Sequence, residues 1–105
     1  MAAEVLWTPK AEEDLVDLHA FIALDNEEAA DRLIERIQAA ADLISHYPRL
    51  GRRRPEIEPS FRMVNEGPYL ILYETFPDTD TDAVPVSTVF IIRVIDGRRD
   101  LSAVF

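Results

Sequence analysis

Cysteine is absent from this 105-residue sequence, so disulfide bonds, thiolate metal ligands and cysteine nucleophiles are all excluded. Their absence fits a reducing cytoplasm. Glycine occurs three times, and no glycine-rich phosphate loop is present. No apolar run approaches the roughly 20 residues of a membrane span, and no basic segment followed by an apolar one opens the chain. These absences predict a cytoplasmic protein with neither a membrane span nor a signal peptide.

Positive charge is scarce and unevenly placed. Eleven Lys and Arg residues stand against twenty Asp and Glu, which gives a net charge of −9. Residues 1–48 hold three basic and eleven acidic residues, for −8, whereas residues 49–105 hold eight arginines and nine acids, for −1. Because nucleic-acid affinity comes largely from cationic contacts that release counterions, no strong direct binding of nucleic acid is expected.

The length and the hydrophobic content of 48% predict one globular domain over residues 1–105. Apolar spacing predicts a strand over residues 3–7 and then two helices, the first beginning after Thr8-Pro9 and the second running from Asn26 to about His46. Tyr47-Pro48 ends the second helix. With a three-residue joint between them, the two helices are expected to form an antiparallel hairpin.

The second half is predicted to be mostly strand. Residues 49–60 are expected to form a loop, residues 61–65 and 69–76 a β-hairpin, and residues 77–85 an exposed acidic loop. The apolar run within residues 86–95 favours a central strand covered on both faces. The order β-α-α-β-β-β predicts an α+β fold, in which the helical hairpin packs on one face of a small, mostly antiparallel sheet.

Seven arginines of the second half are the candidate partner-binding residues. They are Arg52, Arg53, Arg54, Arg62, Arg93, Arg98 and Arg99. The first three lie in the expected loop, where they either neutralise the acidic helices or contact a partner. Arg62 and Arg93 lie within expected strands, where a buried cation needs an ionic partner such as Glu74 or Asp100, unless it binds another protein. Of the adjacent Arg98 and Arg99, one is expected to pair inward and the other to reach a partner.

Other charged residues are expected to have structural roles. The acidic residues of the first helix, Glu12, Glu13, Asp14 and Asp17, are predicted to form a solvated face. His19 is expected at the edge of that helix, and His46 near a helix C-terminus, where the dipole favours its charged form. No spacing of His, Asp and Glu indicates a metal site, and no cofactor is expected.

Several segments together resemble a known family. They are Tyr47-Pro-Arg-Leu-Gly-Arg52, Phe61-Arg62, Tyr69-Leu-Ile-Leu-Tyr73 and Ile92-Arg-Val-Ile-Asp-Gly-Arg-Arg-Asp100. With the Thr-Pro helix start, this pattern resembles the ParE branch of the RelE/ParE toxin superfamily over nearly the whole chain. The resemblance implies a βααβββ fold, a cognate ParD-like antitoxin and, for the best-known ParE proteins, inhibition of DNA gyrase. The acidic loop is longer than the family usually shows, and Asp96 stands where many relatives have histidine.

The RelE branch of the superfamily instead cleaves mRNA on the ribosome, with several Lys or Arg and a C-terminal Tyr or His. Metal-free RNA cleavage needs a base, an acid and cations for the phosphate. This chain offers Arg62, Arg98 and Arg99 as cations, but arginine does not readily give up a proton. The resemblance places the catalytic Tyr position at or near Phe105, which has no proton to donate. We therefore expect no catalytic residues.

The sequence thus favours a non-enzymatic, ParE-like toxin of a type II toxin–antitoxin module. It is expected to inhibit DNA gyrase by binding and to form a hetero-oligomer with its antitoxin, a basic segment of which would suit the acidic helices. Two alternatives remain open at this point. One is a RelE-type, ribosome-dependent mRNA endoribonuclease, and the other is an inactive module that only binds its antitoxin.

Overall fold

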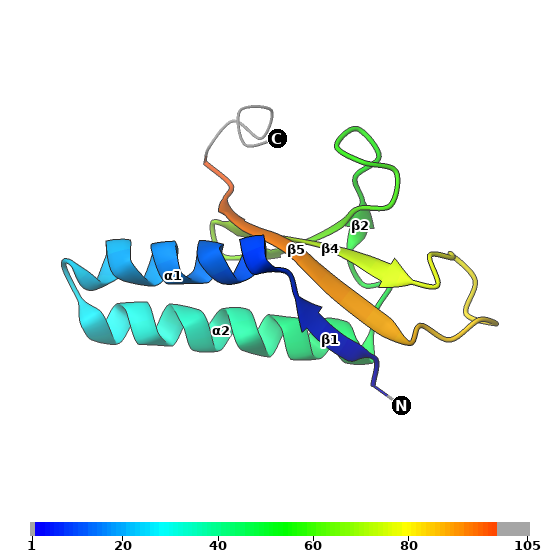
Figure 1. The fold of residues 1–105 in the computed structure, drawn as a ribbon, viewed down its shortest axis with the longest axis horizontal. Coiled ribbons are helices and arrows are strands. Elements are labelled where there is room, and N and C mark those ends of the chain that lie inside the picture. The colour runs from blue at the N-terminus through cyan, green and yellow to red at the C-terminus, as the bar shows by residue number, and fades with distance from the viewer. Residues whose placement is uncertain (1, 99–105) are drawn as a thin grey trace.

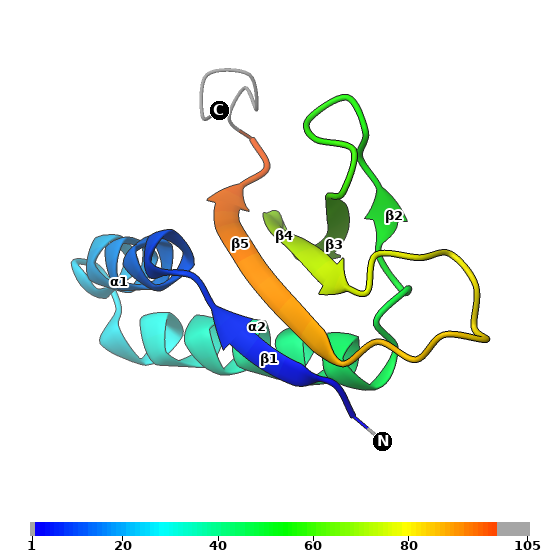
Figure 2. The ribbon, with the colours of Figure 1, turned by 45° about the vertical axis from the view of Figure 1, so that its right-hand side comes forward.

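Five strands form one sheet, and two helices cover one of its faces (Figures 1 and 2). The structure is a computed structural model and describes residues 2–98. In chain order the elements are β1 (Glu4–Trp7), α1 (Pro9–Ala23), α2 (Glu27–His46), β2 (Arg52–Arg53), β3 (Arg62–Glu66), β4 (Tyr69–Phe76) and β5 (Thr88–Asp96). β1 pairs in parallel with β5, and the other neighbours are antiparallel. The predicted α+β fold, with a helical hairpin on a mostly antiparallel sheet, is confirmed.

Both helices begin where the sequence predicts. The hydroxyl of Thr8 accepts a hydrogen bond at 3.2 Å from the backbone N–H three residues later, and Pro9 occupies the first helical position. The side chain of Asn26 caps α2 in the same way at 3.0 Å. Residues 24–26 therefore join the helices into the expected hairpin. None of the helices within residues 2–98 combines the length and the apolar character that a membrane span requires.

The structure corrects the expected coverage of the last strand on both faces, although its central position is as predicted. Across the sheet the order is β1-β5-β4-β3-β2, so β5 is not an edge strand but lies between β1 and β4. Val89 and Ile91 of β5 are fully buried, but Phe90 and Ile92, on the opposite face, are partly exposed. The continuous apolar run of β5 therefore reflects one deeply buried face and one partly covered face.

A second correction concerns the segment expected to be a loop. Arg52 and Arg53 form the short edge strand β2, which pairs with Met63 and Arg62 of β3. The pairing continues as far as a hydrogen bond of 2.8 Å from the backbone N–H of Arg54 to the carbonyl of Phe61. Consecutive arginines carry no apolar alternation, so this strand has no signal in the sequence and forms because β3 offers it an edge.

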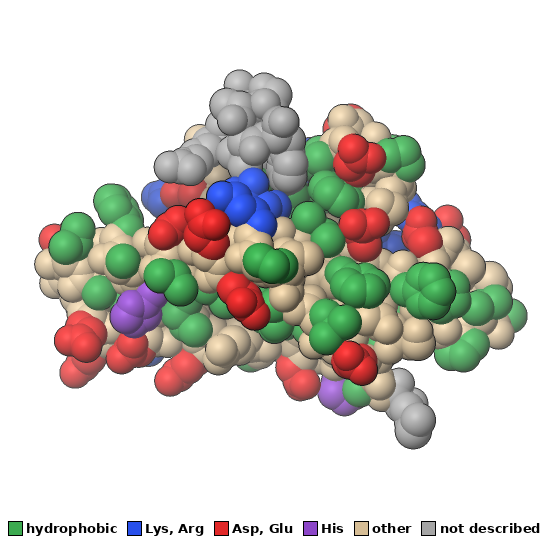
Figure 3. All heavy atoms as spheres, viewed as in Figure 1, with side chains coloured by type: hydrophobic (Ala, Val, Ile, Leu, Met, Phe, Trp, Pro, Cys, Tyr) green, Lys and Arg blue, Asp and Glu red, His purple; other side chains and the backbone are tan. Residues whose placement is uncertain are grey.

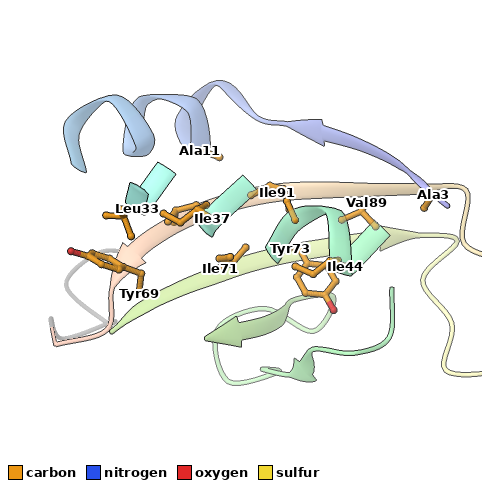
Figure 4. Close-up of a cluster of buried hydrophobic side chains, with 12 residues drawn as sticks. Ala3, Ala11, Leu33, Ile37, Ile44, Tyr69, Ile71, Tyr73, Val89 and Ile91 are labelled. Carbon is orange, nitrogen blue, oxygen red and sulfur yellow. The ribbon is translucent and has the colours of Figure 1, made fainter. Parts of the chain in front are cut away.

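The main core lies between the helical hairpin and the sheet (Figure 4). α2 contributes residues at helical spacing, and β4 and β5 contribute alternate residues of their inner faces. The buried members are Ala3, Ala11, Leu33, Ile37, Ala41, Ile44, Tyr69, Ile71, Tyr73, Val89, Ile91 and Val94. A smaller cluster of Phe61, Leu70, Leu72 and Ile95 lies on the other face of the sheet, with Ile57 of the β2–β3 connection packed against it.

Tyr73 extends the main core to the segment that follows α2. Its buried hydroxyl accepts a hydrogen bond of 2.7 Å from the N–H of Gly51 and donates one of 2.9 Å to the carbonyl of Pro48. A Cβ at Gly51 would lie 2.6 Å from this hydroxyl, so a glycine is required by the close approach. This contact holds the chain in place just before β2.

Candidate functional site

The candidate arginines are spread over three regions of the sheet. Arg52, Arg53, Arg54 and Arg62 lie at the β2–β3 edge, Arg93 lies on β5 beside α1, and Arg98 follows the end of β5. Arg99 lies outside the described residues. Of the seven, the structure brings Arg53 and Arg62 together, because they are directly opposite in the β2–β3 ladder and their side chains share one face.

Arg53 and Arg62 hold the same carboxylate. Oδ1 of Asp80 accepts hydrogen bonds from Nη2 of Arg62 at 2.7 Å and from Nε and Nη2 of Arg53 at 3.1 and 3.0 Å. Arg53 also pairs with Asp78 at 2.8 Å, and Nη1 of Arg62 donates to the carbonyl of Gly51 at 3.0 Å. The acidic loop is therefore fastened to the β2–β3 edge. Arg62 pairs with Asp80 rather than with Glu74, and Asp100, the other expected partner, lies outside the described residues.

Arg49, which was not among the candidates, fastens the same loop. Its Nε donates to the carbonyl of Thr79 at 2.9 Å, and its Nη2 donates to the hydroxyl of Thr79 and to the carbonyl of Val84, both at 2.8 Å. Its Nη1 lies 3.5 Å from Asp82. Asp78, Asp80 and Asp82 do form a solvent-exposed acidic loop, as expected, but all three meet an arginine.

The charges of this cluster stabilise one another. The hydrogen bond from Arg53 is the main reason that the pKa of Asp80 lies below its ordinary value of 3.8, and the positive charges of Arg53 and Arg62 add to the effect. Burial by itself would lower the pKa of Arg53, but its hydrogen bonds and charge interactions with Asp78 and Asp80 raise it above the ordinary value. Arg53 and Asp80 are therefore both charged near neutral pH.

Arg93 is engaged by the first helix. Its Nε and Nη2 donate to the two carboxylate oxygens of Asp14 at 2.7 and 3.1 Å, and the backbone N–H of Val94 donates to the same carboxylate at 3.0 Å. Asp14 is 8% exposed, so the prediction that it belongs to a solvated face is wrong. Its position, three residues after Ala11 and four before Leu18, places it on the buried face of α1, and helical periodicity alone could have found it.

The remaining described arginines lie nearer the surface. Arg98 bonds to Asp96 through Nε at 2.9 Å and Nη2 at 2.6 Å, and this interaction raises its pKa, while its side chain stays 71% exposed. Arg54 pairs with Glu56, whose pKa it lowers through that hydrogen bond. The side chain of Arg52 is exposed and makes no hydrogen bond or ion pair with another residue of the range 2–98.

The histidines lie on the helical hairpin, as expected. Nε2 of His19 lies 2.7 Å from Asp31 of the other helix, and Nδ1 of His46 lies 2.9 Å from the carbonyl of Asp42. Within the described residues, the polar contacts of Arg53 and Arg62 are with carboxylates and carbonyl oxygens, and neither histidine is among them. Within the described residues, no group of three His, Cys, Asp or Glu side chains is placed to hold a metal ion.

The helices present a charged surface with apolar side chains on it. On the face shown in Figure 3, acidic side chains are spread over the helices, whereas Lys and Arg side chains gather near the N-terminal end of α1. The exposed apolar side chains of α1 and its C-terminal end are Val16, Phe21 and Leu24, of which Leu24 is 82% exposed.

Comparison with known proteins agrees with this architecture. Toxin ParE3 of Caulobacter vibrioides is 31% identical over 74 residues, which span 70% of this chain and 65% of that protein's length. The fold is also that of a chain in the chromosomal ParDE toxin–antitoxin system of P. aeruginosa, with a TM-score of 0.66, 19% identity and coverage of 90% of this chain and 96% of that one.

A second structural match is a chain of the toxin–antitoxin complex RelBE2 from Mycobacterium tuberculosis. It has a TM-score of 0.60 and 24% identity, and covers 91% of this chain and 99% of that one. At these identities the two solved structures establish the fold. The family model described as the ParE toxin of the type II toxin–antitoxin system parDE matches residues 5–101. The chain therefore belongs to the ParE toxin family of type II toxin–antitoxin systems.

Proposed function

We propose that this toxin acts by binding DNA gyrase rather than by cleaving RNA. The observation that carries the proposal is the state of its cationic residues. Arg53, Arg62 and Arg93 are each held by carboxylates of the chain itself, and within the described residues neither histidine is among the polar contacts of Arg53 and Arg62. Membership of the ParE family supports gyrase as the target.

The chemistry near Arg62 supports a role without catalysis. Tyr73 is the phenol on the strand next to Arg62, directly opposite it in the β3–β4 ladder. Its hydroxyl is bonded to Pro48 and Gly51, and burial raises its pKa above the ordinary value of 10.0. A phenol with a raised pKa and no solvent exposure is poorly placed to act as a base at neutral pH.

The proposed neutraliser is a ParD-like antitoxin, in a hetero-oligomer formed in the cytoplasm. The helical hairpin offers its surface, because acidic side chains lie beside the exposed Val16, Phe21 and Leu24. A basic, amphipathic antitoxin segment would match both features. The arginines of the second half support this choice, since most of those described already have carboxylate partners in the chain. An antitoxin segment docked solely on the arginine-rich half would contradict it.

Co-purification from the native host tests the proposal. The tagged chain is expressed with its antitoxin under separate control, and the proteins recovered after antitoxin depletion are identified. A gyrase subunit is the expected partner. Recovery of ribosomes together with site-specific cuts in mRNA would instead establish a ribosome-dependent endoribonuclease. Recovery of the antitoxin alone, with growth unaffected by the chain, would indicate a module that only binds its antitoxin.

A further inference from the structure

Arg53 and Arg62 of the β2–β3 edge are largely buried and lie on strands, whereas the carboxylates that they bind are exposed and lie on a loop. Arg62 is 5% exposed and lies within β3, and the side chain of Arg53 on β2 is also largely covered. Asp80, which both arginines hold, lies on the acidic loop of residues 77–85 and its side chain is 75% exposed. The cations are therefore part of the sheet, whereas the anion is carried by the connection between β4 and β5.

Arg62 has a donor that Asp80 does not satisfy. Nη1 is bonded to the carbonyl of Gly51 and Nη2 to Asp80, but Nε is buried and has no hydrogen-bond partner among residues 2–98. A buried donor on a charged group is costly to leave without an acceptor. The site around Arg53 and Arg62 thus contains one donor, Nε of Arg62, that its present occupant does not use.

We propose that Arg53 and Arg62 form a binding site for a carboxylate-rich protein segment, in which Asp80 is a tethered occupant. The acidic loop itself indicates the ligand, because it presents Asp78, Asp80 and Asp82 at alternate positions and Arg53 contacts the first two. An external segment with acids at alternate positions would place one carboxylate between Arg53 and Arg62, and a second oxygen would reach Nε of Arg62. This site goes beyond gyrase binding and does not depend on it.

Arg49 explains why the occupant can leave and return. It binds the carbonyls of Thr79 and Val84, which lie on either side of Asp80 in the chain, so it anchors the loop independently of that carboxylate. A tethered group has an effective concentration in the millimolar range for a short flexible connection, and an external segment must compete with it. The unmodified chain is therefore expected to bind such a segment weakly, and removal of Asp80 to strengthen the binding.

Two variants with the same charge test the proposal. Asp80→Asn removes the shared carboxylate but keeps a carbonyl acceptor, whereas Asp82→Asn removes an equal charge from a fully exposed position on the same loop. The probe is a fluorescently labelled peptide with the sequence of residues 78–82, Asp-Thr-Asp-Thr-Asp, followed by anisotropy at low ionic strength. Asp80→Asn is expected to bind it about tenfold more tightly than Asp82→Asn does, and Arg53→Gln added to Asp80→Asn to abolish the gain.

Equal affinities in the two variants would overturn the proposal. So would binding of inorganic pyrophosphate, but not of the peptide, by Asp80→Asn, since that result would describe a phosphate site. Because the variants could fold incorrectly, the peptide is also titrated into the unmodified chain. The Nε–H resonance of Arg62, followed by NMR, is expected to shift as the peptide is added at millimolar concentration, and an unchanged resonance would contradict the proposal.

Discussion

Asp14 completes the edge of the sheet with a side chain where a strand is missing. β1 pairs with β5 over Thr88–Ile91, and beyond that point β5 faces α1 instead of a strand. The carboxylate of Asp14 accepts the backbone N–H of Val94 and binds the guanidinium of Arg93. A buried backbone N–H needs an acceptor, and a buried guanidinium needs a negative charge. The carboxylate of Asp14 supplies both.

We expect Asp14→Ala to be strongly destabilising. The change takes the carboxylate away from a largely buried arginine and from a buried N–H, and breaking one side of such a pair costs about 3 kcal/mol or more. Asp17→Ala removes an acid from the exposed face of the same helix and is expected to change the free energy of unfolding by less than about 0.5 kcal/mol. Urea denaturation of both variants checks this, and similar losses would show that Asp14 has no special role.

The residue scale also shows where sequence reasoning was limited. The buried arginines Arg62 and Arg93 were correctly expected to need partners, because a buried cation requires one. Their partners were not found, since Asp80 and Asp14 are 18 and 79 residues away along the chain. Pairings at such separations depend on the register of the sheet and on the packing of α1, which no local pattern encodes.

At the scale of elements, Thr8 joins a helix to a strand. Its hydroxyl accepts the first hydrogen bond of α1 and also donates to the carbonyl of Ile92 on β5 at 3.1 Å. Within the described residues, the side chain of Asn26 makes the capping bond to α2 and no bond to a strand. The start of α1 is therefore fixed against the sheet, whereas the start of α2 is fixed by its cap and by core packing.

This difference predicts unequal costs for removing the two caps. Loss of a cap costs about 1 kcal/mol, so Asn26→Ala is expected to lower the free energy of unfolding by that amount. Thr8→Ala also loses a hydrogen bond, which brings the expected loss to about 2 kcal/mol. Thr8→Ser keeps the hydroxyl and is expected to recover most of it. Thermal and urea unfolding of the three variants decide the matter, and equal losses for Thr8→Ala and Asn26→Ala would show that the bond to Ile92 contributes nothing.

The acidic loop is the element whose attachment depends on pH. The pKa of Asp80 in the folded chain is below 3.8, its ordinary value, so the unfolded chain binds a proton more readily than the folded one. The stabilisation is therefore complete above the ordinary value and disappears as the pH falls through the lower, folded value. Near neutral pH, Asp80→Asn should be the less stable protein, because it lacks the ion pairs with Arg53 and Arg62.

The free energies of unfolding of the unmodified chain and of Asp80→Asn are thus expected to converge as the pH is lowered from about 7 to about 3. Chemical denaturation at several pH values measures the gap. Asp82→Asn is the control, because its carboxylate is fully exposed and lies at 3.5 Å from its arginine. A gap between the unmodified chain and Asp80→Asn that is constant over this range would contradict a role for the ionised carboxylate of Asp80.

The sequence predicts those helices and strands that have a local pattern of capping residues or apolar spacing. Thr8-Pro9 and Asn26 mark the helix starts, and residues 69–76 match β4 to the residue. The sequence does not predict β2, because two arginines show no strand pattern. The apolar run of β5 predicts its central position but not that one of its faces is only partly covered. Strand order is a property of the assembled sheet, and β1 takes the edge beside β5 through a parallel pairing that sequence order does not reveal.

At the scale of the whole molecule, the net charge of −9 and the arginine-rich half are compatible with each other. The arginines are largely neutralised where they stand, by Asp78, Asp80 and Asp82 on one side of the sheet and by Asp14 on the other. The surface of the helices keeps its acidic residues. A chain with this distribution suits binding to proteins better than binding to a phosphate backbone, in agreement with the proposed mode of action.

DNA supercoiling with purified gyrase of the native host shows whether this ParE-family toxin acts by binding gyrase. The chain is expected to inhibit supercoiling in proportion to its concentration, and its antitoxin is expected to reverse the inhibition. A parallel reaction with ribosomes and mRNA is expected to show no cleavage. Undiminished supercoiling at a large molar excess of the chain, together with site-specific cleavage of mRNA on the ribosome, would show that the toxin is an endoribonuclease and not a gyrase inhibitor.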